Sequence, residues 1–178
     1  MNIAVVAYPD LDEIDRQWIE SFRAKHDPQA SRLGVHFTLV FPVEAVPGEL
    51  DPEVAVVARS TAAISFAIGR TEVVSDALAK GSHIFLVPDE GGAQITSLHD
   101  RLYAGGLRAQ RRADISFVPH LTVGTTHDSE SAERLARELG VRTRLVRGTV
   151  RTLALVDVGT PRVQSLTTYV LAGGPPAT

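Results

Sequence analysis

Hydrophobic positions along the chain change their spacing from segment to segment, and these changes predict the secondary structure. Continuous or alternating apolar runs are typical of strands, whereas apolar residues three and four apart are typical of a helix that buries one face. Strands are predicted at about 2–8, 35–43, 64–75, 84–87, 115–124, 149–158 and 163–172. Helices are predicted at about 10–24, from 51 onward, at 92–104 and at 129–139, and a loop is expected over 25–34.

The predicted helices have apolar faces and recognisable ends. In the second helix, Asp51 is a good N-cap residue and Pro52 fits the first helical position, where no N–H is needed. The last helix is closed by Gly140. The first helix opens with an acidic turn, and its apolar face is expected to contain Leu11, Ile14, Trp18 and Phe22.

The order of elements repeats along the chain. Each half reads strand, helix, strand, helix, strand, and the halves cover roughly residues 1–82 and 83–172, before a tail at 173–178 that is expected to be flexible. This repetition predicts an internal duplication within a single domain spanning 1–178. We expect two α+β lobes packed about a pseudo-twofold axis, with the middle strands of the two halves side by side.

The composition is that of a globular protein and excludes several kinds of chemistry. Of 178 residues, 44% are hydrophobic and 22% are charged. The absence of cysteine excludes disulfides, thiolate zinc sites and a cysteine nucleophile. The N-terminus has no basic region like that of a signal peptide, and no apolar run approaches the roughly 20 residues of a membrane span. We therefore expect a cytoplasmic protein without membrane contact.

The net charge of −3 is unevenly distributed. Residues 1–89 carry 7 Lys and Arg against 13 Asp and Glu, whereas residues 90–178 carry 11 Arg against 8 acidic residues. Basic side chains attract phosphate groups. We therefore expect phosphate to be bound mainly by the second half.

Two short motifs of the form His-x-Thr occupy equivalent places in the repeated order. They are His36-Phe37-Thr38 and His120-Leu121-Thr122, and their histidines are 84 residues apart. Successive side chains of a strand point to opposite faces, so each His and Thr share one face. The other face of each strand is apolar and is expected to pack in the core; it consists of Val35, Phe37, Leu39 and Phe41 in the first strand and of Phe117, Leu121 and Val123 in the second.

Two imidazoles facing one cleft suit the cleavage of a phosphodiester. The unperturbed pKa of histidine is near 6.5, so one ring can accept a proton from water while the other donates one to the leaving oxygen. The hydroxyls of Thr38 and Thr122 can hydrogen-bond phosphate oxygens, and Gly124, on the same face, would let phosphate approach the backbone. No metal site is expected, because no carboxylate lies at ligand spacing beside either histidine and threonine is a poor zinc ligand.

The segments HFTLVFP and FVPHLTVG resemble the motifs of the two-histidine phosphoesterase superfamily, in particular its 2′-5′ RNA ligase/cyclic phosphodiesterase-like branch. The resemblance implies a bilobal α+β fold with an antiparallel sheet in each lobe, helices outside and a central cleft. It also implies hydrolysis of a 2′,3′-cyclic phosphate, or a related cyclic or 2′-5′-linked phosphodiester, without a cofactor or metal. By this resemblance, His36 and His120 form the acid–base pair, and Thr38 and Thr122 bind phosphate.

Several other side chains are weaker candidates for substrate contact. Arg108, Arg111 and Arg112 precede the second motif and are candidates to contact a phosphate or an RNA backbone, although a solvated basic loop is the favoured explanation for them. Tyr8, at the end of the first strand, is a candidate for the rim of the cleft. The four histidines outside the motifs, His26, His83, His99 and His127, are expected to be ordinary.

The sequence leaves three activities open. The leading hypothesis is a hydrolase that acts on the cyclic phosphate of a nucleotide or RNA end. The alternatives are a non-catalytic module that binds a phosphate, a nucleotide or an RNA end, and an RNA 2′-5′ ligase. We expect the protein to be a monomer, and no sequence feature identifies a protein partner. Where members of the family often carry an arginine after the second motif, this chain has Gly124-Thr125-Thr126, so the motif does not define the substrate.

Overall fold

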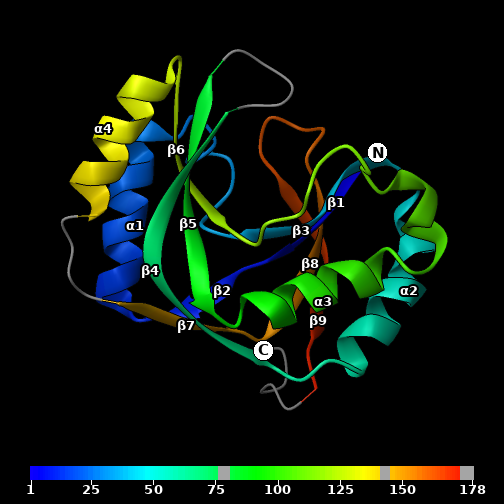
Figure 1. The fold of residues 1–178 in the computed structure, drawn as a ribbon. Helices are drawn as coiled ribbons and strands as arrows, with labels where there is room; N and C mark the ends of the chain where they lie inside the picture. The colour runs from blue at the N-terminus through cyan, green and yellow to red at the C-terminus, as the bar shows by residue number, and fades with distance from the viewer. Residues whose placement is uncertain (76–80, 141–144, 173–178) are drawn as a thin grey trace.

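One curled antiparallel sheet forms the centre of the protein in the computed structural model, which describes residues 1–75, 81–140 and 145–172 (Figure 1). Within these ranges the strands are β1 (Asn2–Ala7), β2 (Pro9–Leu11), β3 (Phe37–Glu44), β4 (Ile64–Ser75), β5 (Ser82–Glu90), β6 (Leu121–Thr126), β7 (Val146–Val150), β8 (Thr152–Asp157) and β9 (Gln164–Val170). The helices are α1 (Glu13–His26), α2 (Pro47–Arg59), α3 (Gly92–Leu102) and α4 (Ser129–Gly140), with a short 3₁₀ helix at Gly106–Gln110. The predicted α+β class is confirmed, and the predicted tail, 173–178, lies outside the described residues.

The two motif strands lie side by side in the middle of the sheet. The strand order is β2-β7-β4-β5-β6-β3-β1-β8-β9, so β6 and β3 are neighbours. They meet at one register pair, Phe37 with Leu121, and both of these side chains are fully buried. The described strands therefore form one continuous sheet, and not a separate sheet in each lobe. Because the central residue of each motif points into the core, the flanking His and Thr project from the opposite face.

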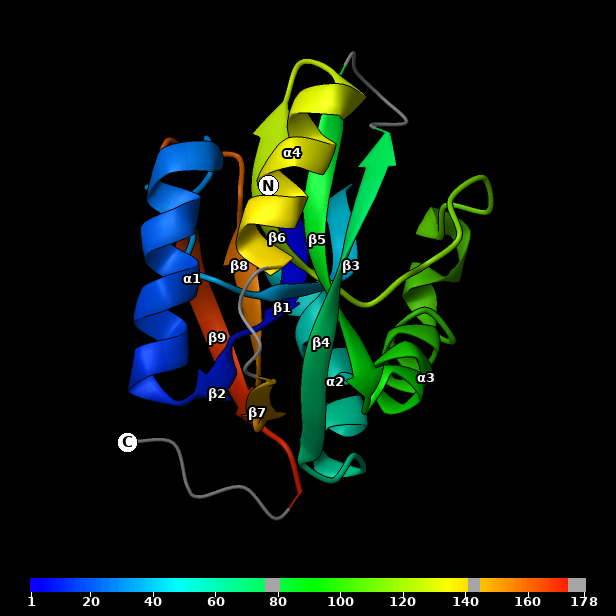
Figure 2. The ribbon, with the colours of Figure 1, turned by 60° about the vertical axis from the view of Figure 1, so that its left-hand side comes forward.

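The helices cover the sheet in two pairs. The first pair, α1 and α4, packs against β4, β5 and β6. In the second pair, α2 packs against β8 and β9, and α3 packs against β3 and also against β4 and β5. Figure 2 shows the two pairs well separated, with α1 beside α4 and α2 beside α3. None of the helices in the described part of the chain is long and apolar enough to cross a membrane.

The predicted repetition of elements is present in the chain order. Strand, helix, motif strand, helix and strand occur first as β1, α1, β3, α2, β4 and again as β5, α3, β6, α4, β7. Each side of the sheet nevertheless contains strands from both predicted halves, since β8 joins β1 and β4 joins β5. The duplication itself, with halves 1–82 and 83–172, stays a prediction.

Several predicted boundaries were wrong for identifiable reasons. The second helix begins at Pro47 and not at Asp51, because an earlier proline occupies the first turn, where a missing N–H costs no hydrogen bond. Ile14 is exposed, since the buried positions of α1 are Asp15, Ile19 and Arg23. The strand β6 begins six residues later than the predicted 115, and the segment before it is irregular.

Candidate active site

His36 and His120 have the same position relative to their strands, because each immediately precedes the first residue of β3 or β6. The Nδ1–H of His36 donates to the carbonyl oxygen of Gly34 at 2.8 Å, and that of His120 donates to the carbonyl oxygen of Val118 at 2.6 Å. A carbonyl oxygen can only accept, so Nδ1 carries the proton in each neutral ring. Nε2 is therefore the nitrogen of each ring that can take up or release a proton.

The side chains of both motifs line one cavity of about 390 Å³. His36 and Thr38 come from the β3 side of the sheet, and His120 and Thr122 come from the β6 side. The pairing of the two motif strands brings these four side chains together. The other lining residues are Asp27, Gln29, Phe41, Val74, Ser75, His83, Phe85, Ile115, Ser116, Val118 and Thr125.

Thr125, and not Gly124, continues the polar wall of the cavity beyond Thr122. The pairing of β5 with β6 shifts register between Ile84 and Phe85, because β6 contains one extra residue at this point. Beyond it, each side chain of β6 points to the face opposite to the one that strict alternation predicts. A Cβ on Gly124 would lie 3.2 Å from the Cδ1 atom of Ile84 and 3.3 Å from Cβ of His26. The prediction that Gly124 shares a face with His120 and Thr122 was therefore wrong.

Phe41 was assigned to the core face of β3, and this was also wrong. The pairing of β3 with β1 shifts register between Val5 and Val6, which pair with Val40 and Thr38. The extra residue in β3 again reverses the faces to which the following side chains point. The half-buried side chain of Phe41 therefore lines the cavity. In both motif strands, the side chain three positions after the motif threonine thus faces the site.

Aromatic rings from β5 support the second histidine. The ring of Phe85 stacks on that of His120 with centroids 3.6 Å apart and an interplanar angle of 17°. The ring of His83 lies nearly parallel to that of Phe85, with centroids 5.8 Å apart and an interplanar angle of 12°. Its Nδ1 lies 3.2 Å from the Oγ1 atom of Thr125. His83, which the sequence classed as ordinary, is therefore a third imidazole in this cavity.

The surroundings of the two motif histidines favour their neutral forms. Burial lowers the pKa of His36 below its usual value, and this effect exceeds the opposing effect of the hydrogen bond to Gly34. Burial also lowers the pKa of His120, to about 4, and the nearby charges of His36 and His83 add to this effect. In the free protein at pH 7, both rings are therefore neutral.

A buried arginine anchors the segment that leads to His36. Arg23 of α1 is 1% exposed, and its guanidinium donates to Asp27 at 2.8 and 3.0 Å and to Glu20 at 2.9 Å. The same group donates to the carbonyl oxygen of Leu33 at 2.8 Å. This network connects the end of α1 to the loop before β3, and Asp27 itself lines the cavity.

The carbonyl group that orients His36 lies between two anchored residues. On one side of Gly34, the carbonyl of Leu33 accepts from Arg23. On the other side, the N–H of Val35 donates to Glu20 Oε1 at 2.6 Å. The backbone that holds the imidazole is therefore fixed by side chains of α1, which no pattern within the motif reveals.

The predicted basic residues do not enter the cavity. Arg111 pairs with Asp100 at 2.7 Å, and Arg112 makes two hydrogen bonds to Asp114 at 2.8 and 2.6 Å. Arg108 is exposed on the 3₁₀ helix, and none of the three lines the cavity. The solvated loop is the better description of this segment.

Tyr8 lies beside the site without lining the cavity itself. Its ring centroid is 6.4 Å from that of His36, in an edge-on arrangement. The side chain is half-buried against the small cluster of apolar residues on β1 and β8, and this burial raises its pKa. Tyr8 therefore packs next to the first histidine.

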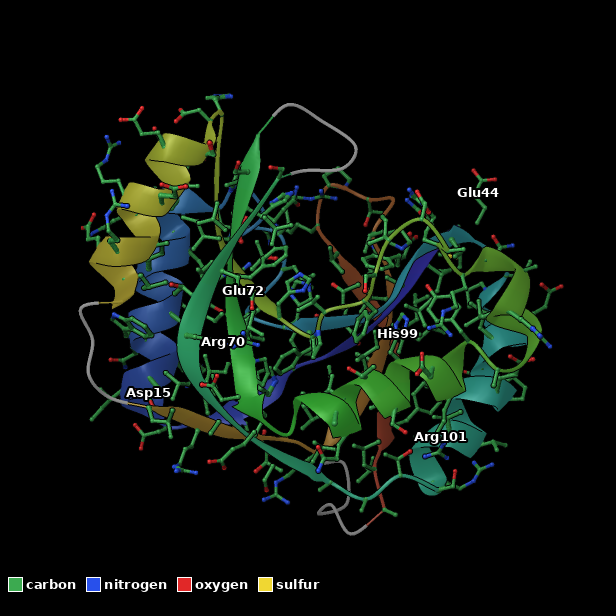
Figure 3. All side chains as sticks on the ribbon, in the orientation of Figure 1. Asp15, Glu44, Arg70, Glu72, His99 and Arg101 are labelled. Carbon is green, nitrogen blue, oxygen red and sulfur yellow. The ribbon has the colours of Figure 1, made fainter. Side chains whose placement is uncertain are left out.

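His99 has a structural position on α3, as the sequence indicated (Figure 3). It is 3% exposed, stacks on Phe117 with centroids 3.7 Å apart, and its Nδ1–H donates to the carbonyl of Leu39 at 2.8 Å. It therefore connects α3 to β3. Within the described ranges, no three or more His, Cys, Asp or Glu side chains are grouped so as to hold a metal ion.

The comparison with known families agrees with this geometry. The model of the 2′-5′ RNA ligase superfamily matches residues 11–161, which is most of the chain. The protein therefore belongs to the 2′-5′ RNA ligase superfamily, a superfamily of two-histidine phosphoesterases. The resemblance predicted from the two motifs is confirmed. A search of the curated proteins found no match.

Solved structures with the same fold match nearly the whole chain. The protein TT0787 of Thermus thermophilus is 19% identical with a TM-score of 0.62, over 97% of this chain and 99% of that chain. E. coli LigT complexed with 3′-AMP is 19% identical with a TM-score of 0.55, over 96% and 98%. Kluyveromyces marxianus Usb1 is 14% identical with a TM-score of 0.53, over 93% and 97%. These similarities show the fold.

Proposed function

We propose that this protein is a phosphoesterase that opens a 2′,3′-cyclic phosphate, or a related cyclic or 2′-5′-linked phosphodiester, on a nucleotide or RNA end. The proposed reaction is metal-independent acid–base catalysis by His36 and His120. The observation that carries the proposal is that both rings line one cavity and that each is held through Nδ1 by a carbonyl oxygen. Both rings can therefore use Nε2 for proton transfer.

The two histidines would act on opposite sides of the phosphorus atom. One neutral ring takes a proton from water at Nε2 while the water oxygen bonds to phosphorus. The other ring, protonated, gives its Nε2 proton to a ribose oxygen as the bond between that oxygen and phosphorus breaks. The product is a phosphate monoester with a free ribose hydroxyl. Each proton transfer is worth about 10²–10⁴-fold in rate.

Thr38 and Thr122 would hold the phosphate between the rings. Both hydroxyls line the cavity on the same face as their histidines. A hydroxyl that donates to a non-bridging oxygen orients the phosphorus for attack and stabilises the charge that develops there. Phe85 supports this arrangement, because its ring packs against His120.

RNA 2′-5′ ligation is the second candidate function, and the family membership favours it. The same proton transfers would catalyse ligation if the 5′-hydroxyl of a second RNA end attacked phosphorus in place of water. The ring that accepts the proton then deprotonates this hydroxyl, and the cyclic phosphate becomes a phosphodiester. The ring opening itself supplies the leaving group, so no nucleotide triphosphate is needed.

The test is incubation of the protein with 2′,3′-cyclic AMP in EDTA, followed by chromatography of the products. We expect conversion to 2′-AMP or 3′-AMP. Binding without conversion, with or without added Mg²⁺ or Zn²⁺, would contradict an enzyme and indicate a binding module. Conversion only after a metal is added would contradict the metal-independent reaction. A parallel incubation of an RNA cyclic-phosphate end with a 5′-hydroxyl RNA end detects ligation.

A further inference from the structure

The two motif strands separate as soon as they have met. The strands β3 and β6 share one register pair, Phe37 with Leu121. Antiparallel pairing continued from this pair would place residues 117–119 opposite 39–41. In the described chain, however, residues 111–120 belong to no strand or helix. The backbone of β3 beyond Phe37 must therefore find other partners on this edge.

Side chains from the end of α3 take the place of the missing strand. The Nδ1–H of His99 donates to the carbonyl oxygen of Leu39 at 2.8 Å. The hydroxyl oxygen of Tyr103, one helical turn further on, accepts from the N–H of Phe41 at 3.1 Å. Both side chains are buried, and their ring centroids lie 4.9 Å apart. Because buried backbone groups without a partner are costly, these two bonds stabilise β3 where β6 has left it.

The same histidine contacts the chain before the second motif. Its ring stacks on that of Phe117 with centroids 3.7 Å apart and an interplanar angle of 8°. Phe117 packs against the core and directly precedes Val118, which is exposed. The carbonyl oxygen of Val118 accepts from Nδ1 of His120. The contact with His99 therefore anchors, within an irregular segment, the carbonyl group that orients His120.

We propose that His99 is a positioning residue of the active site, which fixes the second His-x-Thr motif relative to the first where β3 and β6 separate. It is hydrogen-bonded to β3 one residue after Thr38 and stacked on the chain three residues before His120. His99 does not line the catalytic cavity, so it acts through the backbone and not on the substrate. Burial lowers the pKa of His99, so its ring is neutral at pH 7. The effect on catalysis rests on the proposed function, whereas the effect on the geometry of His120 does not.

The tautomer of His120 reports this role independently of activity. In the wild type at pH 7, we expect ¹⁵N NMR of the ring nitrogens to show the proton on Nδ1, where Val118 accepts it. His99→Asn keeps an N–H donor for Leu39 but removes the ring that packs on Phe117. The segment before β6 should then shift, and His120 should show a mixture of its two tautomers. His99→Phe keeps a ring against Phe117, so His120 should stay protonated on Nδ1.

Activity should change in parallel with the tautomer. For 2′,3′-cyclic AMP, His99→Asn should lower kcat by about 10- to 100-fold with little change in KM, and His99→Phe should lower it less. Leu98→Ala is the matched control, because Leu98 is buried on the same helix and does not line the catalytic cavity. It should lower the thermal midpoint but leave kcat and the tautomer unchanged.

Phe117→Leu removes the other ring of the contact and should give the same change of tautomer, including the case in which His99→Asn does not fold. A proton that stays on Nδ1 of His120 in Phe117→Leu and His99→Asn, or an equal change in Leu98→Ala, would overturn this inference while the proposed function stands. If the tautomer responds as expected but the wild type does not hydrolyse cyclic AMP, the proposed function fails and the positioning of His120 by His99 stands.

Discussion

The guanidinium of Arg23 lies 2.8 Å from the carboxylate of Asp27, and the two side chains are only 1% and 3% exposed. This buried ion pair lies beneath the loop that leads to His36, and Asp27 also lines the catalytic cavity. Two charges removed from water are stable only when they remain paired and hydrogen-bonded. The pair therefore connects the stability of the fold to the geometry of the site.

Replacement of Arg23 by methionine should lower the free energy of unfolding by about 3–5 kcal/mol, because Asp27 would remain buried without its partner. Urea denaturation followed by circular dichroism measures the change. The control is Arg16→Met on the exposed side of α1, where the pair with Glu13 is more than half exposed and is screened by water, so its loss should change stability little. Similar denaturation midpoints for the two variants would contradict this account of Arg23.

Glu20→Ala should lower kcat by about 10- to 100-fold with little change in KM, because small displacements of a catalytic group have large effects on rate. Glu20 accepts from the N–H of Val35, next to the carbonyl of Gly34 that orients His36. Glu20→Gln keeps an acceptor oxygen and should restore most of the rate. Glu13→Ala on the same helix is the control. A change confined to KM, or equal losses for Ala and Gln, would exclude a positioning role for Glu20.

The rate should be highest at acidic pH. The reaction needs one neutral and one protonated ring, and burial lowers the pKa of His36 below 6.5 and that of His120 to about 4. The productive form of the free enzyme carries one proton on the two rings, and both pKa values lie below 6.5, so kcat/KM should be highest below about pH 6.5. As the pH rises above this value, the ring that must donate a proton loses it, and kcat/KM falls. An increase that continues to pH 8 would contradict these pKa directions.

His83→Gln tests the electrostatic part of this prediction. The charge of His83 helps to lower the pKa of His120, so its removal should raise that pKa. The limb of the kcat/KM profile that His120 governs should then move to higher pH, while the other limb changes little. A profile in which neither limb moves would show that His83 does not influence the pKa of His120.

Much of the fold was predictable because hydrophobic spacing reflects burial directly. The strands β1 and β4 and the helix α3 follow their predicted ranges closely. Helix α1 was predicted less well, because one of its buried positions is the charged residue Arg23. The burial of Arg23 depends on Asp27 and Glu20 and on the loop packed against them, and hydrophobic spacing does not reveal such partners.

The candidate site, too, was predictable where local spacing determines it and was missed where pairing with a distant strand determines it. The two His-x-Thr motifs were recognisable because strand alternation alone puts each pair on one face. Phe41 and Thr125 were missed because a register shift in each motif strand reverses that alternation. His83 and Phe85 were missed because they come from β5, whose place beside β6 is fixed by sheet pairing.

The central claim is that His36 and His120 act together in one catalytic step. The kinetics of three variants test this claim most directly. We would measure kcat/KM for 2′,3′-cyclic AMP in EDTA with His36→Ala, His120→Ala and the double variant, each checked for folding. Each single change should reduce kcat/KM by about 10²–10⁴-fold, and the double variant should be no worse than the more impaired single variant. Undiminished activity in either single variant would contradict the two-histidine mechanism.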